Sequence, residues 1–166
     1  EIPQAVTAAA FAAARSRGIV TILNPAPAAS MDPALLAVSD WVIPNEVEFA
    51  GLSRASSDAT DSEIAAFASA TGTRVVVTMG SRGAALLGAD GAVHRIPASP
   101  VQAVDTTGAG DAFLGAFAYG LASGLDERAA VTLGVRCASD SVLRPGTQKS
   151  FPSTERARSF LDGLEG

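Results

Sequence analysis

The sequence predicts an α/β fold in which helices cover a mostly parallel β-sheet. Short apolar runs alternate along the chain with longer amphipathic or alanine-rich segments, as expected when strands alternate with helices. Hydrophobic residues make up 48% of the 166 residues and charged residues 17%, so the chain has enough apolar side chains to bury a core. This length is typical of one domain.

Three apolar runs in the first half of the chain predict buried strands, at residues 19–23, 40–43 and 74–78. The segments around them predict helices, at residues 4–17, 46–51 and 61–71. Alanine, the best helix former, dominates the first of these helices, and Gly18 ends it. Asp61 is the expected cap of the third helix.

In the second half, Asp90-Gly91 between two apolar runs predicts a β-hairpin with strands at 84–88 and 93–96. A last strand is expected at 101–104, before a turn rich in glycine. Three helices should follow, at residues 111–124, at residues 126 to about 143, and after a cap at Ser153 or Thr154.

Charge and cysteine content exclude several classes of partner. The net charge of −5 argues against nucleic acid and anionic membrane surfaces, and no stretch approaches the ~20 apolar residues of a membrane span. The single cysteine, Cys137, excludes an internal disulfide and fits a reducing compartment. We therefore expect a cytoplasmic protein. Because a helix begins directly after Glu1, we also expect that earlier chain is missing.

The segment Asp105-Thr106-Thr107-Gly108-Ala109-Gly110-Asp111 has the features of an anion-binding site. A strand leads into a turn of small residues, and the turn opens a helix whose first amides are unpaired and carry positive partial charge. Small side chains let a phosphate approach these amides. Asp111, in the first helical turn, could take a proton from an attacking hydroxyl. A helix cap in a glycine turn is the simpler alternative, but the complete string favours the site.

This string resembles the signature of the ribokinase family of carbohydrate kinases. Four further segments are similar to the family's motifs in order and spacing: Leu23-Asn24-Pro25-Ala26-Pro27-Ala28, Pro44-Asn45-Glu46-Val47-Glu48, Thr78-Met79-Gly80-Ser81-Arg82-Gly83 and Arg144-Pro145-Gly146-Thr147-Gln148-Lys149-Ser150. The resemblance covers the chain but only the C-terminal half of the family's three-layer αβα fold. The N-terminal sugar-binding part and the lid are absent from residues 1–166.

The resemblance implies phosphoryl transfer from ATP to a sugar hydroxyl, with Mg²⁺ and K⁺ as cofactors. Ribose is the expected sugar, because the Asn-Pro-Ala-Pro and Arg-x-Gly-x-Gln-x-Ser patterns fit a ribose kinase best. Two alternatives remain open. The chain could belong to a kinase of fructose, a keto-deoxy sugar acid or a nucleoside, or it could be an inactive fragment that binds nucleotide. The missing N-terminal half or a second copy of the chain is the expected partner.

The resemblance also implies roles for individual residues. Asp111 is the expected catalytic base, beside an anion hole of Gly108, Ala109 and Gly110. The expected nucleotide contacts are Asn45, Thr78, Gly80, Ser81, Arg82, Gly83, Gly110 and Asp111. Glu48 should hold Mg²⁺ through water, and the expected K⁺ positions are Asp105, Thr107, Ser141, Arg144, Gly146 and Ser150. Glu1 and Asp111 should contact the sugar.

Three of these assignments compete with simpler interpretations. Asn45 and Glu48 taken alone suit a helix cap better than a metal site. Asp105 could equally orient its own turn.

Val135 stands where the family often has a polar residue near adenine, so we expect loose discrimination between nucleotides.

Overall fold

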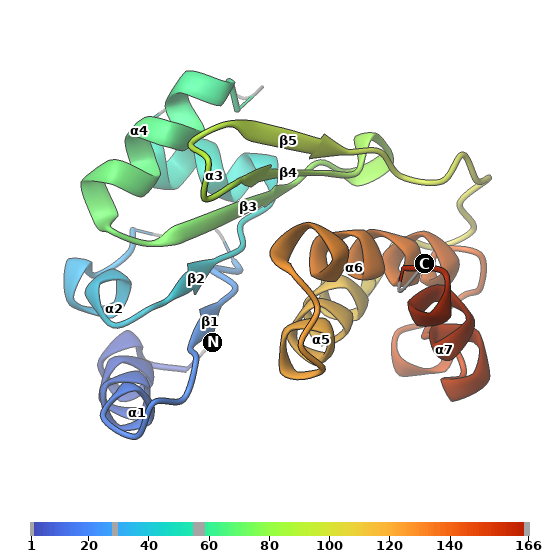
Figure 1. Ribbon diagram of the computed structural model, residues 1–166, viewed down its shortest axis with the longest axis horizontal. Coiled ribbons are helices and arrows are strands. Elements are labelled where there is room, and N and C mark those ends of the chain that lie inside the picture. The colour runs from blue at the N-terminus through green and yellow to red at the C-terminus, as the bar shows by residue number, and fades with distance from the viewer. Residues whose placement is uncertain (1, 28–29, 55–58, 165–166) are drawn as a thin grey trace. The chain divides into compact units, whose positions relative to one another are not determined.

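The computed structural model describes residues 2–27, 30–54 and 59–164 (Figure 1). Its five strands follow the order β1-β2-β3-β4-β5 in one sheet. The chain divides into two compact units. The first unit contains the residues up to Thr78 together with Leu87–Val93, and the second contains Met79–Leu86 and the residues from His94 onward. Each unit is described separately.

The first unit alternates helices with short parallel strands. Its elements are α1 (Gln4–Arg15), β1 (Ile22–Leu23), α2 (Pro33–Ala37), β2 (Trp41–Val42), α3 (Glu46–Ser53), α4 (Asp61–Thr71) and β3 (Arg74–Thr78). β2 pairs in parallel with both β1 and β3. Both α3 and α4 pack against β3, whose central residues Val75, Val76 and Val77 are fully buried. The predicted core strand at 74–78 is therefore confirmed residue for residue.

The second unit contains the hairpin strands and a helical layer. Its elements are η1 (Gly80–Arg82), β4 (Ala84–Leu87), β5 (Val93–Ile96), α5 (Ala109–Ala122), α6 (Glu127–Ser141), η2 (Gln148–Ser150) and α7 (Thr154–Asp162), of which β4 and β5 each extend by one residue into the first unit. Figure 1 shows α5 and α6 packed side by side. Glycine makes this close approach possible, because a Cβ at Gly134 would lie 2.9 Å from the ring of Phe113.

Several predicted elements differ from the structure. The strand expected at 19–23 shortens to β1, and Ile19 and Val20 are 55% and 58% exposed. No strand forms at 101–104; instead the amides of Val104 and Asp105 both donate to the carbonyl of Val142. Residues 101–104 are exposed, so water can satisfy the rest of their backbone without a strand partner.

The predicted cap of α4 was wrong, and the short helix α2 was not predicted. Thr60, not Asp61, is the N-cap of α4, and it forms a capping box with Glu63. Helix α2 was not predicted, although Asp32-Pro33 is a start signal: Asp32 accepts from the amide of Ala34, and proline occupies the first helical position. The caps of α6 at Asp126 and of α7 at Ser153 are confirmed.

We predict that Gly134→Ala destabilises the protein by about 1–3 kcal/mol, because the new methyl group overpacks the contact with Phe113. Gly115→Ala is the matched control, since a Cβ there, also in this helix pair, meets nothing within 4 Å. Urea unfolding of both variants would measure the difference. Equal transition midpoints would contradict the packing described here.

Candidate active site

The turn that precedes α5 has the geometry of an anion-binding loop. Gly108 is the N-cap of α5, with a left-handed φ of 76°, and no side chain caps this helix. The amide of Ala109 donates to the carbonyl of Thr106 at 3.2 Å, so it closes the turn. Within the part of the chain that the structure describes, the amides of Gly110 and Asp111 have no partner. These two amides are therefore the donors that an anion would meet.

Asp111 lies in the first turn of α5, as the sequence predicts, and its side chain is exposed. It lies at a pocket of about 490 Å³ between α5, α6 and α7. Small and apolar side chains dominate the lining: Ala112, Gly115, Ala116, Leu133, Cys137, Phe151, Pro152, Ala157 and Leu161, with Tyr119, Thr154 and Arg158 as further polar members. Gly110, one residue earlier, has open space around its Cα. A ligand can thus reach both the carboxylate and the free amides.

Asp105 joins this turn to the loop at residues 144–150. Its Oδ1 accepts from the amide of Thr107 and its Oδ2 from the amide of Gly146, each at 2.9 Å. The bond from Gly146, followed by that from Thr107, lowers the pKa of Asp105 from 3.8 to about 2. The loop also touches the turn directly, since a Cβ at Gly108 would lie 3.4 Å from Cα of Thr147.

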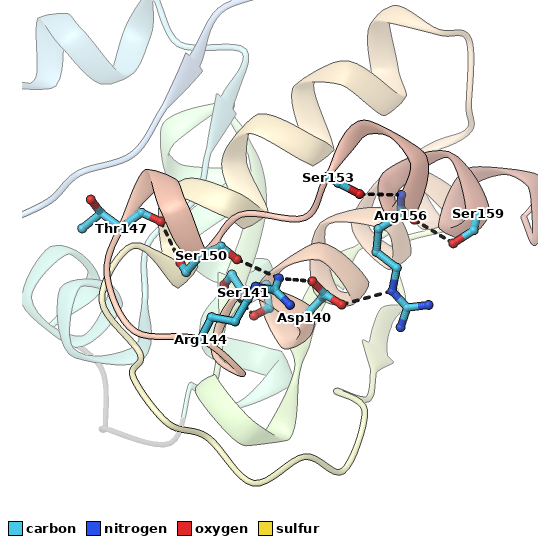
Figure 2. A network of polar contacts seen from close by, with 9 residues as sticks. Asp140, Ser141, Arg144, Thr147, Ser150, Ser153, Arg156 and Ser159 are labelled. Atoms are coloured by element: carbon cyan, nitrogen blue, oxygen red, sulfur yellow. Dashed lines mark hydrogen bonds and ion pairs between the residues drawn. The ribbon is translucent and has the colours of Figure 1, made fainter.

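In and around the 144–150 loop, polar side chains mainly hold the backbone in place through hydrogen bonds, and we call these side chains clamps (Figure 2). The Arg144 guanidinium donates to the carbonyl of Ser150 at 2.8 Å and to the carboxylate of Asp140. Ser150 is fully buried, and its hydroxyl donates to the carbonyl of Thr147 at 2.7 Å. The hydroxyl of Ser141 donates to the carbonyl of Ala138 at 2.8 Å.

These bonds limit how the predicted K⁺ positions could act. An arginine side chain has only donors, so Arg144 could face a cation only through its backbone carbonyl. The buried hydroxyls of Ser141 and Ser150 donate their protons to backbone carbonyls, and each oxygen keeps lone pairs that could face a cation. Backbone carbonyls of the loop, these two hydroxyl oxygens and Asp105 are the groups that could bind a monovalent cation.

In the first unit, Asn45 and Glu48 form the capping box of α3. The Asn45 side chain accepts from the amide of Glu48, and Glu48 Oε2 accepts from the amide of Asn45, both at 2.9 Å. The helix-cap interpretation is therefore correct. It does not exclude ligand binding, because the Asn45 side chain is exposed and Glu48 keeps a second carboxylate oxygen.

Asn45 and Thr78 lie at neighbouring carboxyl ends of the parallel strands β2 and β3. They form an isolated parallel bridge, and the amide of Thr78 donates to the carbonyl of Pro44 at 2.9 Å. The carboxyl edge of a parallel sheet is where α/β proteins bind ligands. The structure therefore brings together two residues that the sequence assigned to the nucleotide from separate motifs.

The loop after β3 contains one glycine with a structural role and one without. A Cβ at Gly83, which has φ of 93°, would overlap the carbonyl oxygen of Ile96, so this position requires glycine for packing. Gly80 has φ of 53° and open space around it. Ser81 and Arg82 are exposed in η1. Gly80, Ser81 and Arg82 are thus accessible to a ligand, whereas Gly83 shapes the loop.

Other predicted positions are buried or not described. Glu1 lies outside the described residues. Val135 is only 5% exposed, so a base could touch little of it. Burial, and next the charge of Asp140, raise the pKa of the Cys137 thiol to about 11, which keeps this thiol protonated. Sequence reasoning missed Asp140 itself, a carboxylate that is 7% exposed. The only signal in the sequence is that an acidic residue falls on the side of α6 that carries buried residues.

Among the described residues, no group of three or more His, Cys, Asp or Glu side chains could hold a metal ion. No described helix is long and apolar enough to cross a membrane. A divalent ion would therefore need oxygen atoms from a substrate or from water in addition to Glu48, as is usual for Mg²⁺.

Comparison with known proteins identifies the class. The deoxyribokinase of Salmonella typhi is 40% identical over 151 residues, which are 89% of this chain and 49% of that protein. The ribokinase of Mus musculus is also 40% identical, over 92% of this chain and 49% of its own length. The Arabidopsis thaliana ribokinase complexed with ribose and ATP superposes with a TM-score of 0.86 at 27% identity, over 96% of this chain and 53% of that one.

Residues 1–154 match the model of the pfkB family carbohydrate kinases, and the chain belongs to this family. The ribokinase-like α/β fold predicted from the sequence is confirmed. The chain spans about half the length of the curated relatives it matches.

We predict that the Asp105 clamp, meaning the two hydrogen bonds that its carboxylate accepts from Thr107 and Gly146, survives mild acid. Because the pKa of Asp105 falls from 3.8 to about 2 on folding, its stabilisation is complete above pH 3.8 and is lost between 3.8 and about 2. Hydrogen exchange of the Thr107 and Gly146 amides should therefore stay slow, after correction for intrinsic rates, at pH 4. Asp105→Asn keeps only one acceptor oxygen, so it should expose at least one of the two amides at every pH. Unchanged protection in this variant would contradict the clamp.

Proposed function

We propose that this chain is the ATP-binding and catalytic half of a sugar kinase, which transfers the γ-phosphoryl group of ATP to a sugar hydroxyl. One observation carries the proposal: an exposed carboxylate, Asp111, lies next to two unpaired amides at the start of α5. Family membership supports the same chemistry. Phosphoryl transfer needs positioning and charge stabilisation more than covalent chemistry, and this arrangement supplies both.

In the proposed reaction, Asp111 accepts the proton of the attacking sugar hydroxyl as its oxygen forms a bond to the γ-phosphorus. The bond between that phosphorus and the bridging oxygen of ADP breaks, and ADP leaves. The amides of Gly110 and Asp111 donate to the phosphoryl oxygens, where negative charge is concentrated. Because Gly110 has no side chain and open space around it, the phosphate can approach closely.

For the nucleotide, we propose that Asn45, Thr78 and the exposed residues Gly80, Ser81 and Arg82 contact ATP. Mg²⁺ would neutralise charge on the phosphates. Glu48 fits this ion, since its Oε2 is fixed by the amide of Asn45 while its other oxygen remains available. Mg²⁺ commonly binds through one carboxylate, several waters and substrate phosphates. The partly buried capping box would thus hold Glu48 in one orientation.

For K⁺, we propose a site among the backbone carbonyls of the 144–150 loop and Asp105. Ionised Asp105 supplies negative charge, and its two bonds to backbone amides fix the turn and the loop together. A monovalent ion would thereby support the shape of the anion-binding turn. The cytoplasm, where K⁺ is abundant and thiols such as Cys137 stay reduced, is the compartment that we propose.

Ribose is the sugar that we propose, and 2-deoxyribose is the second candidate. Identity does not separate them, because a deoxyribokinase and a ribokinase are each 40% identical to this chain. The Arabidopsis thaliana relative complexed with ribose and ATP favours ribose. A site that binds the 2-hydroxyl would reject deoxyribose strongly, whereas a site without such a contact would accept both. Fructose, keto-deoxy sugar acids and nucleosides complete the test panel.

The partner that we propose is the N-terminal half of the family's fold, with a second copy of the chain as the alternative. In the first unit, the exposed Ile19 and Val20 precede the edge strand β1. Apolar side chains beside an open strand edge favour association. Sugar recognition would then depend largely on the partner, whereas the turn before α5 is formed within this chain.

Asp111→Asn should lower kcat by about 10²–10⁴-fold with little change in the KM for ATP, because it removes the base and keeps the backbone amides. Asp126→Asn is the matched control. It is also an aspartate-to-asparagine change at a helix start, and asparagine caps as well as aspartate does. Steady-state kinetics in an active form of the kinase would test both. A near-normal kcat for Asp111→Asn would remove the assignment.

We expect the isolated 166-residue chain to be inactive on sugars and to become active when the N-terminal half of a ribokinase relative is added. Light scattering and a coupled ADP-release assay with the sugar panel would follow assembly and turnover. Turnover of ribose by the unaided monomer would disprove the need for a partner. Activity on a different sugar alone would correct the substrate and leave the kinase assignment intact.

A further inference from the structure

The carboxylate of Asp140 occupies an unfavourable position unless it has a specific task. It lies in the last turn of α6, where the helix dipole disfavours negative charge, and it is 7% exposed. A buried charge is costly unless it is paired. Figure 2 shows the pairing: Arg144 binds Oδ2, and Nε of Arg156 binds Oδ1 at 3.1 Å. One carboxylate therefore holds a guanidinium from the loop after α6 and another from α7.

The first of these guanidinium groups closes the 144–150 loop. Besides Asp140, Arg144 Nη2 binds the carbonyl of Ser150 at 2.8 Å, so a residue at one end of the loop is tied to the other end. Ser150 in turn donates through its hydroxyl to Thr147. Without Asp140, the Arg144 side chain would lose the group that fixes its direction.

The closed loop supports the anion-binding turn. Gly146 donates to Asp105, and the Gly108 position packs against both Thr147 and Phe151, whose ring would lie 3.3 Å from an added Cβ. A chain of contacts therefore runs from Asp140 through Arg144 and the loop to the residue that opens α5. Every link in it lies within the second unit.

Charge gives Asp140 a second effect. The Arg144 guanidinium lies within 2.8 Å of a loop carbonyl, and a positive charge there repels any cation that approaches the loop. The carboxylate of Asp140 offsets this charge. Removal of the carboxylate would leave Arg144 uncompensated, whereas removal of Arg156 would leave more negative charge near the loop.

We propose that Asp140 is a positioning residue, which holds the Arg144 clamp of the 144–150 loop and offsets the guanidinium charge so that the loop can accept K⁺. It is not among the residues proposed above to contact nucleotide or sugar. The part that concerns K⁺ rests on the proposed function. The part that concerns the clamp does not.

Asp140→Asn and Arg156→Gln test the proposal as a pair. Asp140→Asn removes the charge from both ion pairs of Asp140, whereas Arg156→Gln breaks only the pair with Arg156, and the two variants change the net charge in opposite directions. Hydrogen exchange of the Gly146 amide is the first measurement, in the full chain without nucleotide. We expect Asp140→Asn to lose at least about tenfold in protection while the Ala129 amide, at the other end of α6, is unchanged. Arg156→Gln should keep the Gly146 protection.

The same amide reports K⁺ binding when KCl replaces tetramethylammonium chloride at constant ionic strength. We expect Asp140→Asn to raise the half-saturating K⁺ concentration about tenfold, as changes behind a metal site commonly do. Arg156→Gln should leave that concentration equal or lower it. A folded Asp140→Asn with unchanged protection would overturn the clamp, and an Arg156→Gln that weakens K⁺ equally would overturn the charge effect.

Two further outcomes remain informative. If K⁺ has no effect on the wild-type chain, the K⁺ part of the proposed function fails, and the exchange measurement still tests the clamp. If Asp140→Asn does not fold, native-state exchange of the wild type replaces it. The amides of Thr107, Gly146 and Ser150 should then open together, with one free energy, because one clamp closes the whole loop. Separate opening of these amides would overturn the proposal.

Discussion

The proposed catalytic end of the second unit depends on the two hydrogen bonds that the carboxylate of Asp105 accepts, from Thr107 and from Gly146. These bonds join a turn and a loop that are 41 residues apart in the sequence. The amide of Asp105 ties the turn to the end of α6 through the carbonyl of Val142, and the charged acceptor supplies the connection to the loop. The turn that presents the amides of Gly110 and Asp111 is held in shape by this connection.

Polar groups in this chain combine a structural role with the proposed chemical one. Asn45 and Glu48 cap α3 through one atom each, and the atoms left over are those that could meet ATP and Mg²⁺. A side chain fixed in a helix cap has little motion left before ATP or Mg²⁺ arrives. The loss of side-chain entropy that binding must offset is therefore smaller. A residue whose structural role is established is therefore not excluded from the site.

The Asp140 network follows the same principle one layer further from the proposed site. A well-packed apolar side chain in place of Asp140 could stabilise the fold about as well, since buried ion pairs are often no more stabilising than apolar replacements. The value of Asp140 lies in direction and charge. It orients Arg144 along the loop and docks α7 through Arg156, whose guanidinium also stacks on the ring of Phe160 at 4.5 Å.

Elements whose signals are local could be predicted from the amino-acid sequence alone. The valine run of β3, the caps at Asp126 and Ser153, and the small-residue turn before Asp111 all follow from intrinsic preferences within a few residues. The family motifs likewise indicated which residues belong to the proposed site. The register, length and burial of elements with weaker signals could not be read from the chain. Residues 101–104 resemble a strand, yet they form none, and the amide of Val104 donates instead to the carbonyl of Val142 at the end of α6.

Which polar groups already have hydrogen-bond or ionic partners became clear from the folded structure. It showed that the Ala109 amide closes its own turn, that Gly83 is required by the backbone of Ile96, and that Arg144 is a clamp. It also revealed Asp140, whose two arginine partners lie 4 and 16 residues away. The physical reason is that hydrogen bonds and ion pairs are satisfied by whatever lies nearest in space, and sequence separation does not specify that distance.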